Sequence, residues 1–234
     1  MHKVIVLVHH GTSNEKINEK TYTKLKSEVE ILHPHAKVYE VFTSRIVNNR
    51  IIKKRETFDN ILDMLKKDNI KEIEILHTNL SNGDIYKGII SKLDNSKIDY
   101  KINKPLLDSL DLSKLVSILP YDKNKNIIFI GHGNSTSNKD YENLQNEFYK
   151  QTKNNVRVCV LSQLRTNDIS FLNLDKEKDI EIYPLMFVEG FHAQKDVKST
   201  IKIFDDYKCN YNSYSLGECK EIRNLFCEMI SKTK

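Results

Sequence analysis

The sequence predicts an α/β fold built from two similar halves. Short apolar runs alternate with longer amphipathic stretches along the whole chain, and this alternation is typical of parallel strands joined by crossover helices. Two features also recur in the same order: a strand followed by His-Gly, and later an Ile-Glu-Ile strand followed by a loop with glycine. These observations predict two parallel four-stranded sheets, each flanked by helices.

Four strand-like runs lie in each half. In the first half they are KVIVLV, AKVYEVF, KEIEILH and KIDYKI, and in the second half NIIFI, VRVCVL, DIEIYPLM and CNYNSYS. The stretches between them, such as NEKINEKTYTKLKSEVEIL and TFDNILDMLKKDN, place apolar residues three and four positions apart, which is the spacing of an amphipathic helix. We therefore expect strand and helix to alternate through both halves.

Constant offsets relate the two halves. His10 and His132 are 122 positions apart (132 minus 10), whereas Gly83 and Gly190 are 107 apart (190 minus 83), as are the two Ile-Glu-Ile segments (180 minus 73). On this basis we divide the chain into an N-terminal α/β subdomain, a C-terminal α/β subdomain and a last helix free to pack on either, with these bounds: 1–104, 105–217 and 218–234.

Composition narrows the class of protein. The 234 residues are 39% hydrophobic and 29% charged, which is typical of a folded globular chain. The net charge of +5 comes from scattered lysines without a basic stripe, so we expect no nucleic-acid partner and favour an anionic small molecule.

Localisation is predicted from two absences in the sequence. Only five consecutive apolar residues, Val4 to Val8, precede His9 and His10, too few for a signal or a membrane span. The four cysteines show no Cys-x-x-Cys spacing, so neither a disulfide framework nor a thiolate zinc site is indicated. A cytoplasmic location without membrane association is the expectation.

Histidines end the first strand of each half. In open α/β sheets, ligands bind at the carboxyl ends of the strands, where His10 and His132 fall. We expect Thr12 and Ser13, and likewise Ser135 and Ser137, to cap the helices that follow. If the halves face one another, both imidazoles would line one cavity with the loops near Gly83 and Gly190, and the second loop adds His192. Imidazole at such a place serves as a general base near neutral pH, as a metal ligand, or as both.

Other motifs fit less well. A histidine phosphatase needs Arg-His-Gly, but His9 stands where the arginine belongs, so the charge partner of the transition state is missing. Ser135 lacks the Gly-x-Ser-x-Gly elbow of serine hydrolases. Neither Gly-x-Gly-x-x-Gly nor a P-loop is present, so no nucleotide cofactor is expected. We expect His9, His33 and His77, like His35, to be turn or core residues.

Seven short stretches in order carry a family resemblance: GTS (11–13), VFTSRI (41–46), LHTNLSNGDIY (76–86), PLL (105–107), FIGHG (129–133), PLMFVEGFHAQKDV (184–197) and LGE (216–218). Over nearly its whole length the chain resembles the class II metal chelatases, in particular the anaerobic sirohydrochlorin cobaltochelatases of cobalamin biosynthesis. The resemblance implies two facing subdomains, a tetrapyrrole in the cleft between them, and insertion of Co2+ without a nucleotide cofactor. It also implies that His132 binds the metal and accepts pyrrole protons, and that His192 is a second metal ligand.

The chain departs from this family at one ligand. The family's acidic ligand would fall where this chain has Leu161, and leucine neither binds a metal nor accepts a proton. The small, single-domain class II chelatases carry a histidine after their first strand, which His10 resembles. We therefore expect a three-imidazole site of His10, His132 and His192, with Glu189 as a second candidate ligand.

Several alternatives stay open at this stage. Fe2+ or Ni2+ could replace Co2+, because imidazole sites rank metals poorly by themselves. The protein could also be a non-catalytic tetrapyrrole or metal carrier of the same fold, or a phosphoester hydrolase. The similar halves leave self-association into a homo-oligomer open. We assign these residues to substrate binding: Thr12, Ser13, Asn82, Gly83, Glu189 and Phe191.

Overall fold

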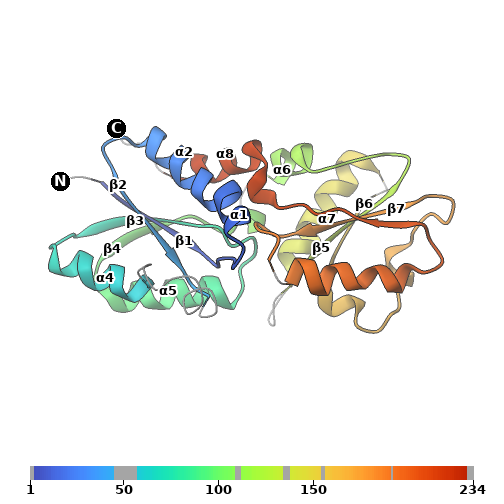
Figure 1. The fold of residues 1–234 in the computed structure, drawn as a ribbon, viewed down its shortest axis with the longest axis horizontal. Coiled ribbons are helices and arrows are strands. Elements are labelled where there is room, and N and C mark those ends of the chain that lie inside the picture. Colours follow the sequence, from blue (N-terminus) through green and yellow to red (C-terminus); the bar gives the residue numbers. More distant parts are fainter. Residues whose placement is uncertain are drawn as a thin grey trace.

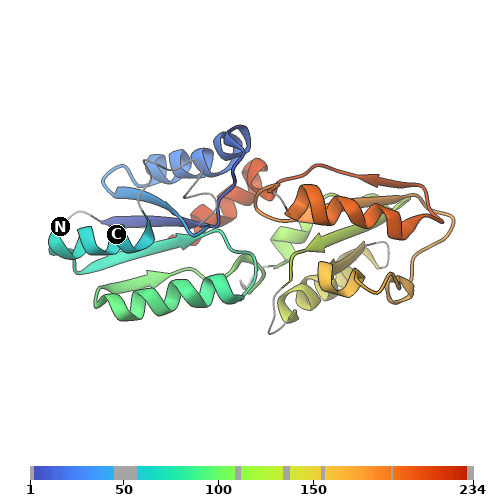
Figure 2. The same cartoon turned by 60° about the horizontal axis from the view of Figure 1, so that its bottom comes forward.

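A computed structural model gives the structure of residues 3–44, 57–108, 112–133, 138–153, 156–190 and 192–230, without the side chains of His192 and Ala193. Figures 1 and 2 show two α/β halves lying side by side along the long axis of the molecule. Within the described residues, no helix combines the length and the apolar character needed to cross a bilayer.

The N-terminal half contains one parallel sheet with the strand order β2-β1-β3-β4. Its elements are β1 (Val4–His9), α1 (Glu15–Asn18), the π-helical turn η1 (Glu19–Thr23), α2 (Lys24–Leu32), β2 (Lys37–Phe42), α4 (Phe58–Lys67), β3 (Glu72–His77), α5 (Asp84–Ser96) and β4 (Asp99–Ile102).

The C-terminal half contains a second parallel sheet with the order β6-β5-β7-β8. Its elements are η2 (Leu106–Asp108), α6 (Leu112–Ile118), β5 (Asn126–Gly131), α7 (Lys139–Thr152), β6 (Val156–Val160), η3 (Leu161–Leu164), η4 (Ser170–Leu172), β7 (Ile180–Leu185), η5 (His192–Val197), η6 (Thr200–Phe204), β8 (Cys209–Tyr211), η7 (Leu216–Glu218) and α8 (Lys220–Glu228). The predicted fold class, two similar parallel four-stranded sheets flanked by helices, is confirmed.

Strand register reproduces the sequence offsets. Ile5 of β1 pairs with Glu74 of β3, and Ile127 of β5 pairs with Glu181 of β7. These partners differ by the same 122 (127 minus 5) and 107 (181 minus 74) positions that the sequence shows. An ion pair repeats as well, because Lys3 binds Glu74 as Lys125 binds Glu181. The two sheets are therefore equivalent residue by residue near their centres.

Strand β1 shows how each sheet is covered. Successive side chains of a strand point to opposite faces. Ile5 and Leu7 pack with residues of α2, whereas Val6 and Val8 pack with residues of α4 and α5. Strand β5 behaves the same way, with Phe129 facing α7 and its neighbours facing the short turns η3 to η6. Helices or helical turns thus bury both faces of each sheet, as parallel sheets require.

Helix α8 lies at the junction of the halves (Figure 1). It contacts α2 of the first half and α6 of the second, and Phe226 belongs to an apolar cluster that runs through both. Arg223, 5% exposed, donates two hydrogen bonds to one oxygen of Glu28 on α2 and one to the other, at 2.8–3.1 Å. The same guanidinium donates to the carbonyls of Gly217 and Glu218 at 2.9 Å. Helix α8 therefore ties the first half to the last turn of the second.

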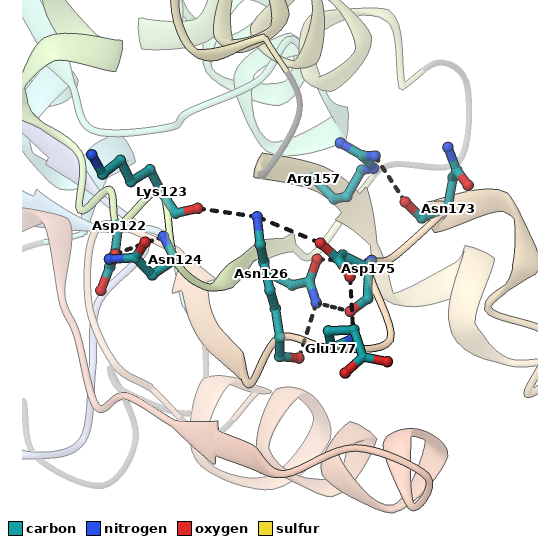
Figure 3. Close-up of polar contacts among 9 residues, drawn as sticks. Asp122, Lys123, Asn124, Asn126, Arg157, Asn173, Asp175 and Glu177 are labelled. Carbon is teal, nitrogen blue, oxygen red and sulfur yellow. Dashed lines mark hydrogen bonds and ion pairs between the residues drawn. The ribbon is translucent and has the colours of Figure 1, made fainter.

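Polar side chains close the amino-terminal edge of the second sheet (Figure 3). The Asn126 amide donates to the carbonyls of Asp175 (2.8 Å) and Lys178 (3.1 Å), and Lys178 Nζ donates to the Lys123 carbonyl. This network joins the loop before β5 to the loop before β7. The opposite, carboxyl edge is the one from which the His-Gly turn emerges.

Two local expectations need correction. The run CNYNSYS is paired as a strand only over β8, because the chain turns toward η7 after Tyr211. Thr12 and Ser13 do not cap the first helix. Asn14 does so, with its side-chain oxygen accepting the Ile17 N–H at 3.3 Å, while Thr12 Oγ1 accepts the Asn14 N–H one step earlier.

Candidate metal and tetrapyrrole site

The turn after β1 separates two neighbouring histidines. His9 ends the strand with its side chain fully enclosed, whereas His10 is exposed. Gly11 follows with φ +99°, a left-handed conformation that favours glycine. The Thr43 hydroxyl lies 3.5 Å from His10 Nδ1. The strand end therefore presents the His10 imidazole outward while the neighbouring imidazole stays inside.

His9 is held on every side. Its Nδ1 lies 3.1 Å from Thr78 Oγ1 and its Nε2 lies 3.5 Å from Glu40 Oε1. The ring stacks on Tyr22 with centroids 4.1 Å apart. The Tyr22 hydroxyl accepts the Gly11 N–H at 3.4 Å, and burial raises the pKa of this phenol. His9 is thus a structural residue beneath the turn that carries His10.

The turn after β5 repeats this geometry. His132 is exposed and its Nδ1 lies 3.2 Å from the Gly133 carbonyl. Gly133 has φ +78°, and a Cβ there would lie 2.9 Å from Val160 Cβ. Gly131 occupies the position of His9 in the repeat, and the Tyr141 ring fills the space, since a Cβ on Gly131 would lie 2.2 Å from its Cε1. Both halves therefore display one outward imidazole before a left-handed glycine.

Strand β3 ends with another buried imidazole. The His77 Nε2–H donates to the Asn103 carbonyl (2.8 Å), and Nδ1 accepts the Asn79 N–H (3.2 Å). Burial lowers the pKa of His77 to about 4, so the ring is neutral at pH 7. This environment agrees with the expectation that His77 is a structural residue. The hydrogen bonds of His77 fix the start of the loop that carries Asn82 and Gly83.

That loop reaches the other half. The exposed Asn82 donates its backbone N–H to Asp140 Oδ2 of α7 at 2.7 Å. The Tyr141 hydroxyl is hydrogen-bonded to Ser81 and to the backbone of Gly133, and burial raises its pKa. The structure therefore brings the Asn82–Gly83 loop next to the turn that carries His132. Sequence reasoning missed Asp140 and Tyr141, because a contact across 58 positions leaves no local signal.

The loop after β7 is fastened to the segment after β8. Glu189 accepts hydrogen bonds from the hydroxyls of Tyr211 (3.1 Å) and Ser213, and its N–H donates to Ser215 Oγ at 2.7 Å. Phe187, just before, stacks on Tyr22 of the first half with centroids 5.2 Å apart. This loop therefore also meets the first half, close to the turn that carries His10.

Other predicted site residues lie as follows. Thr12 is buried and Ser13 is exposed, and Gly83 is partly exposed before α5. The backbone of His192 begins η5, but its side chain and the whole of Phe191 lie outside the described residues, as do Ser135, Ser137 and the 45–56 segment. Leu161 starts η3 and packs against the apolar cluster on the outer face of the second sheet.

No metal cluster is complete within the described side chains. There, no three residues among His, Cys, Asp and Glu converge to hold an ion. The three-imidazole site expected from sequence includes His192, whose side chain is not described, so it stays a prediction. The structure brings the neighbouring segments together in two pairs. The loop after β3 contacts α7 and the turn after β5, and Phe187 after β7 stacks on Tyr22 near the turn after β1.

The family model for "Cobalt chelatase (CbiK)" matches residues 3–234. The chain belongs to the cobalt chelatase family. Its family acts on tetrapyrroles, so this protein is a tetrapyrrole metal chelatase. The predicted resemblance to class II chelatases is confirmed.

Solved structures show the same fold as this chelatase. SirB from Bacillus subtilis with Fe3+ has a TM-score of 0.65 at 16% identity, over 98% of this chain and 94% of that one. The SirB sirohydrochlorin chelatase from Bacillus subtilis subspecies spizizenii in complex with cobalt has 0.62 at 13%, over 98% and 94%. CbiX, described as the terminal enzyme of siroheme biosynthesis in denitrifying bacteria, has 0.59 at 11%, over 97% of both chains. No curated protein matches the chelatase significantly in sequence.

Proposed function

We propose that this chelatase inserts Co2+ into sirohydrochlorin in the cleft between its halves. The observation that carries the proposal is the pair of equivalent His-Gly turns, each with an exposed imidazole at the carboxyl edge of its sheet. The family match supports the reaction class, and the cobalt complex of SirB supports the metal. A cytoplasmic enzyme of anaerobic cobalamin biosynthesis is the role that fits this activity.

In this proposal three imidazoles hold the metal substrate. His132 and His192 are the ligands implied by the family, and His10 takes the place left by Leu161. Neutral imidazoles replace some waters of the ion and leave positions open for the pyrrole nitrogens, as open catalytic metal sites do. The ion's charge lowers the pKa of the pyrrole N–H groups, so His132 can accept a proton at neutral pH.

Among the other residues assigned to substrate binding, four are proposed to contact the macrocycle and Thr12 to support them. Ser13 and Asn82 are exposed beside the two turns and offer polar groups to the carboxylates of the substrate. Gly83 precedes α5, so the N-terminal N–H groups of that helix add a favourable site for a carboxylate. Thr12 supports the first turn from inside, and Phe191 supplies a ring for stacking.

The test is an absorption assay with sirohydrochlorin and Co2+. Turnover of many equivalents per protein supports the enzyme. A spectral change that stops at one equivalent would instead indicate a carrier, the alternative favoured by Leu161, and phosphate release from an aryl phosphate would indicate a hydrolase. Parallel assays with Fe2+ and Ni2+ rank the metals.

Histidine variants test the ligand set. We expect His132→Ala and His192→Ala to lower kcat/KM at least about 100-fold. We expect His10→Ala to weaken Co2+ binding by at least the roughly 10- to 100-fold that losing a group that supports a ligand costs. His35→Ala is the matched control, because His35 is exposed on the turn before β2, at the amino edge of the first sheet. Unchanged Co2+ affinity in His10→Ala would remove His10 from the site.

The pH profile tests the role of neutral imidazole. Because protonated imidazole neither binds a metal nor accepts a proton, activity should fall as the pH is lowered into the acid range. A flat rate between about pH 5 and pH 8 would contradict the proposed base.

A further inference from the structure

Glu189 stands three positions before His192 and is the acid that sequence reasoning offered as a second metal ligand. The structure gives its carboxylate a different set of partners. Tyr211 and Ser213, at the end of β8 and just after it, each donate a hydroxyl hydrogen bond to one of its two oxygens. The carboxylate is therefore directed at the segment after β8.

The backbone around Glu189 is fastened to the same segment. Its N–H donates to the hydroxyl of the buried Ser215 at 2.7 Å. On the preceding residues, the carbonyls of Met186 and Phe187 accept the N–H groups of Leu216 (3.0 Å) and Gly217 (2.8 Å). Loop 186–189 is thus anchored through main chain and side chain together.

The anchor continues into the element that carries His192. The carbonyl of Gly190 accepts the Gln194 N–H of η5 at 3.1 Å. This hydrogen bond joins the backbone that follows Glu189 to the first turn of η5, which begins at His192. Burial and the adjacent Glu189 carboxylate raise the pKa of Tyr211, so this phenol stays protonated and keeps its donor.

We propose that Glu189 is a positioning residue for His192: clamped by Tyr211 and Ser213, it fixes the loop that sets where η5 begins. It acts through that loop and is not a ligand of the metal. The consequence for catalysis rests on the proposed function, whereas the anchor itself does not.

Three variants separate positioning from ligation. Glu189→Ala removes the clamp. Glu189→Gln keeps both hydrogen bonds without the charge, because the amide oxygen accepts from one hydroxyl and the NH2 group donates to the other. An amide is, however, a poor metal ligand. The double variant Tyr211→Phe, Ser213→Ala leaves the carboxylate and removes its partners. Glu177→Ala is the matched control, an exposed acid at the opposite end of β7 (Figure 3).

Amide hydrogen exchange in the 186–197 segment measures directly how firmly the loop is anchored. We expect Glu189→Ala and the Tyr211/Ser213 double variant to exchange about tenfold or more faster than wild type, the effect of losing hydrogen bonds to a charged group. Glu189→Gln and Glu177→Ala should stay close to wild type. Equal exchange in wild type and Glu189→Ala would overturn the proposal.

Enzyme kinetics measure the consequence of the anchor for catalysis. We expect kcat for cobalt insertion to fall roughly 10- to 100-fold in Glu189→Ala and in the double variant, with Glu189→Gln restoring most of it. Combining Glu189→Ala with the double variant should add little. If Gln and Ala lower Co2+ affinity equally, Glu189 is a ligand and the proposal fails. If wild type turns over no sirohydrochlorin, the proposed function falls while the exchange result still decides on the anchor.

Discussion

Replacing Arg223 by methionine should weaken the contact between the two halves and lower the free energy of unfolding. The guanidinium is 5% exposed and makes five hydrogen bonds, three to Glu28 on α2 and two to backbone carbonyls before α8. Methionine keeps the apolar stem and length but leaves Glu28 and both carbonyls without these donors. Glu28 therefore becomes a carboxylate without its cation at the junction.

The size of the effect follows from burial. Removing one partner of a buried ion pair costs about 3–5 kcal/mol, and the 22% exposure of the Glu28 side chain places this pair at the lower end, about 3 kcal/mol. For a chain of this length we expect the melting temperature to fall by about 6–12 °C. Glu28→Ala should cost a similar amount, and the two changes together should cost much less than their sum.

Urea unfolding and thermal melting measure this prediction. The control is Glu228→Ala, which breaks the exposed pair with Lys114 (62% and 55% exposed) on the same helix and should cost at most about 1 kcal/mol. If Arg223→Met lowers the free energy of unfolding no more than Glu228→Ala does, the junction is not held by this network and the reasoning is wrong.

Two further predictions concern stability. Gly217→Ala should destabilise the protein by about 1–3 kcal/mol, because the new Cβ would lie 2.7 Å from Phe187 Cε1 and 2.9 Å from the Phe187 carbonyl oxygen. Gly88→Ala on α5 meets nothing within 4 Å and should stabilise the protein by about 0.5–1 kcal/mol. Denaturant midpoints measure both effects, and equal effects would contradict the steric argument. Because the pKa of His77 is lowered to about 4, the unfolded chain takes up a proton below pH 6.5 that the folded chain refuses, so stability is complete above pH 6.5 and is lost as pH falls toward 4. Wild type should lose on the order of 3 kcal/mol more than His77→Gln across this window, and parallel pH curves would refute the assignment.

Local patterns predicted most of the fold. The β-branched runs and the helical spacing locate strands and helices because these signals lie within a few residues. The repeat offsets predicted the equivalence of the two sheets, and strand register confirmed it at Ile5 and Ile127. The prediction that Thr12 and Ser13 cap the first helix was wrong. Thr12, Ser13 and Asn14 are all residue types that favour the capping position, and the residue at which the helix begins selects Asn14.

Contacts between distant segments could not be predicted in this way. Arg223 and Glu28 are 195 positions apart, and neither position announces a partner in its own neighbourhood. Likewise, adjacency in sequence does not distinguish the enclosed His9 from the exposed His10, because the groups that enclose His9, such as Tyr22 and Thr78, come from other segments. The hydroxyls that bind Glu189 were missed for the same reason: Tyr211 and Ser213 come from a different strand end.

The position of α8 has a consequence for how the molecule is made. Strands β1 to β4 leave the ribosome first, yet the apolar face of α2 is covered by residues of α8 such as Phe226, which are synthesised after all eight strands. Domains begin to fold during synthesis, N-terminal parts first. Until residue 226 has emerged, the apolar face of α2 lacks this cover, so a pause in translation before that point leaves this face open to chaperones and to aggregation.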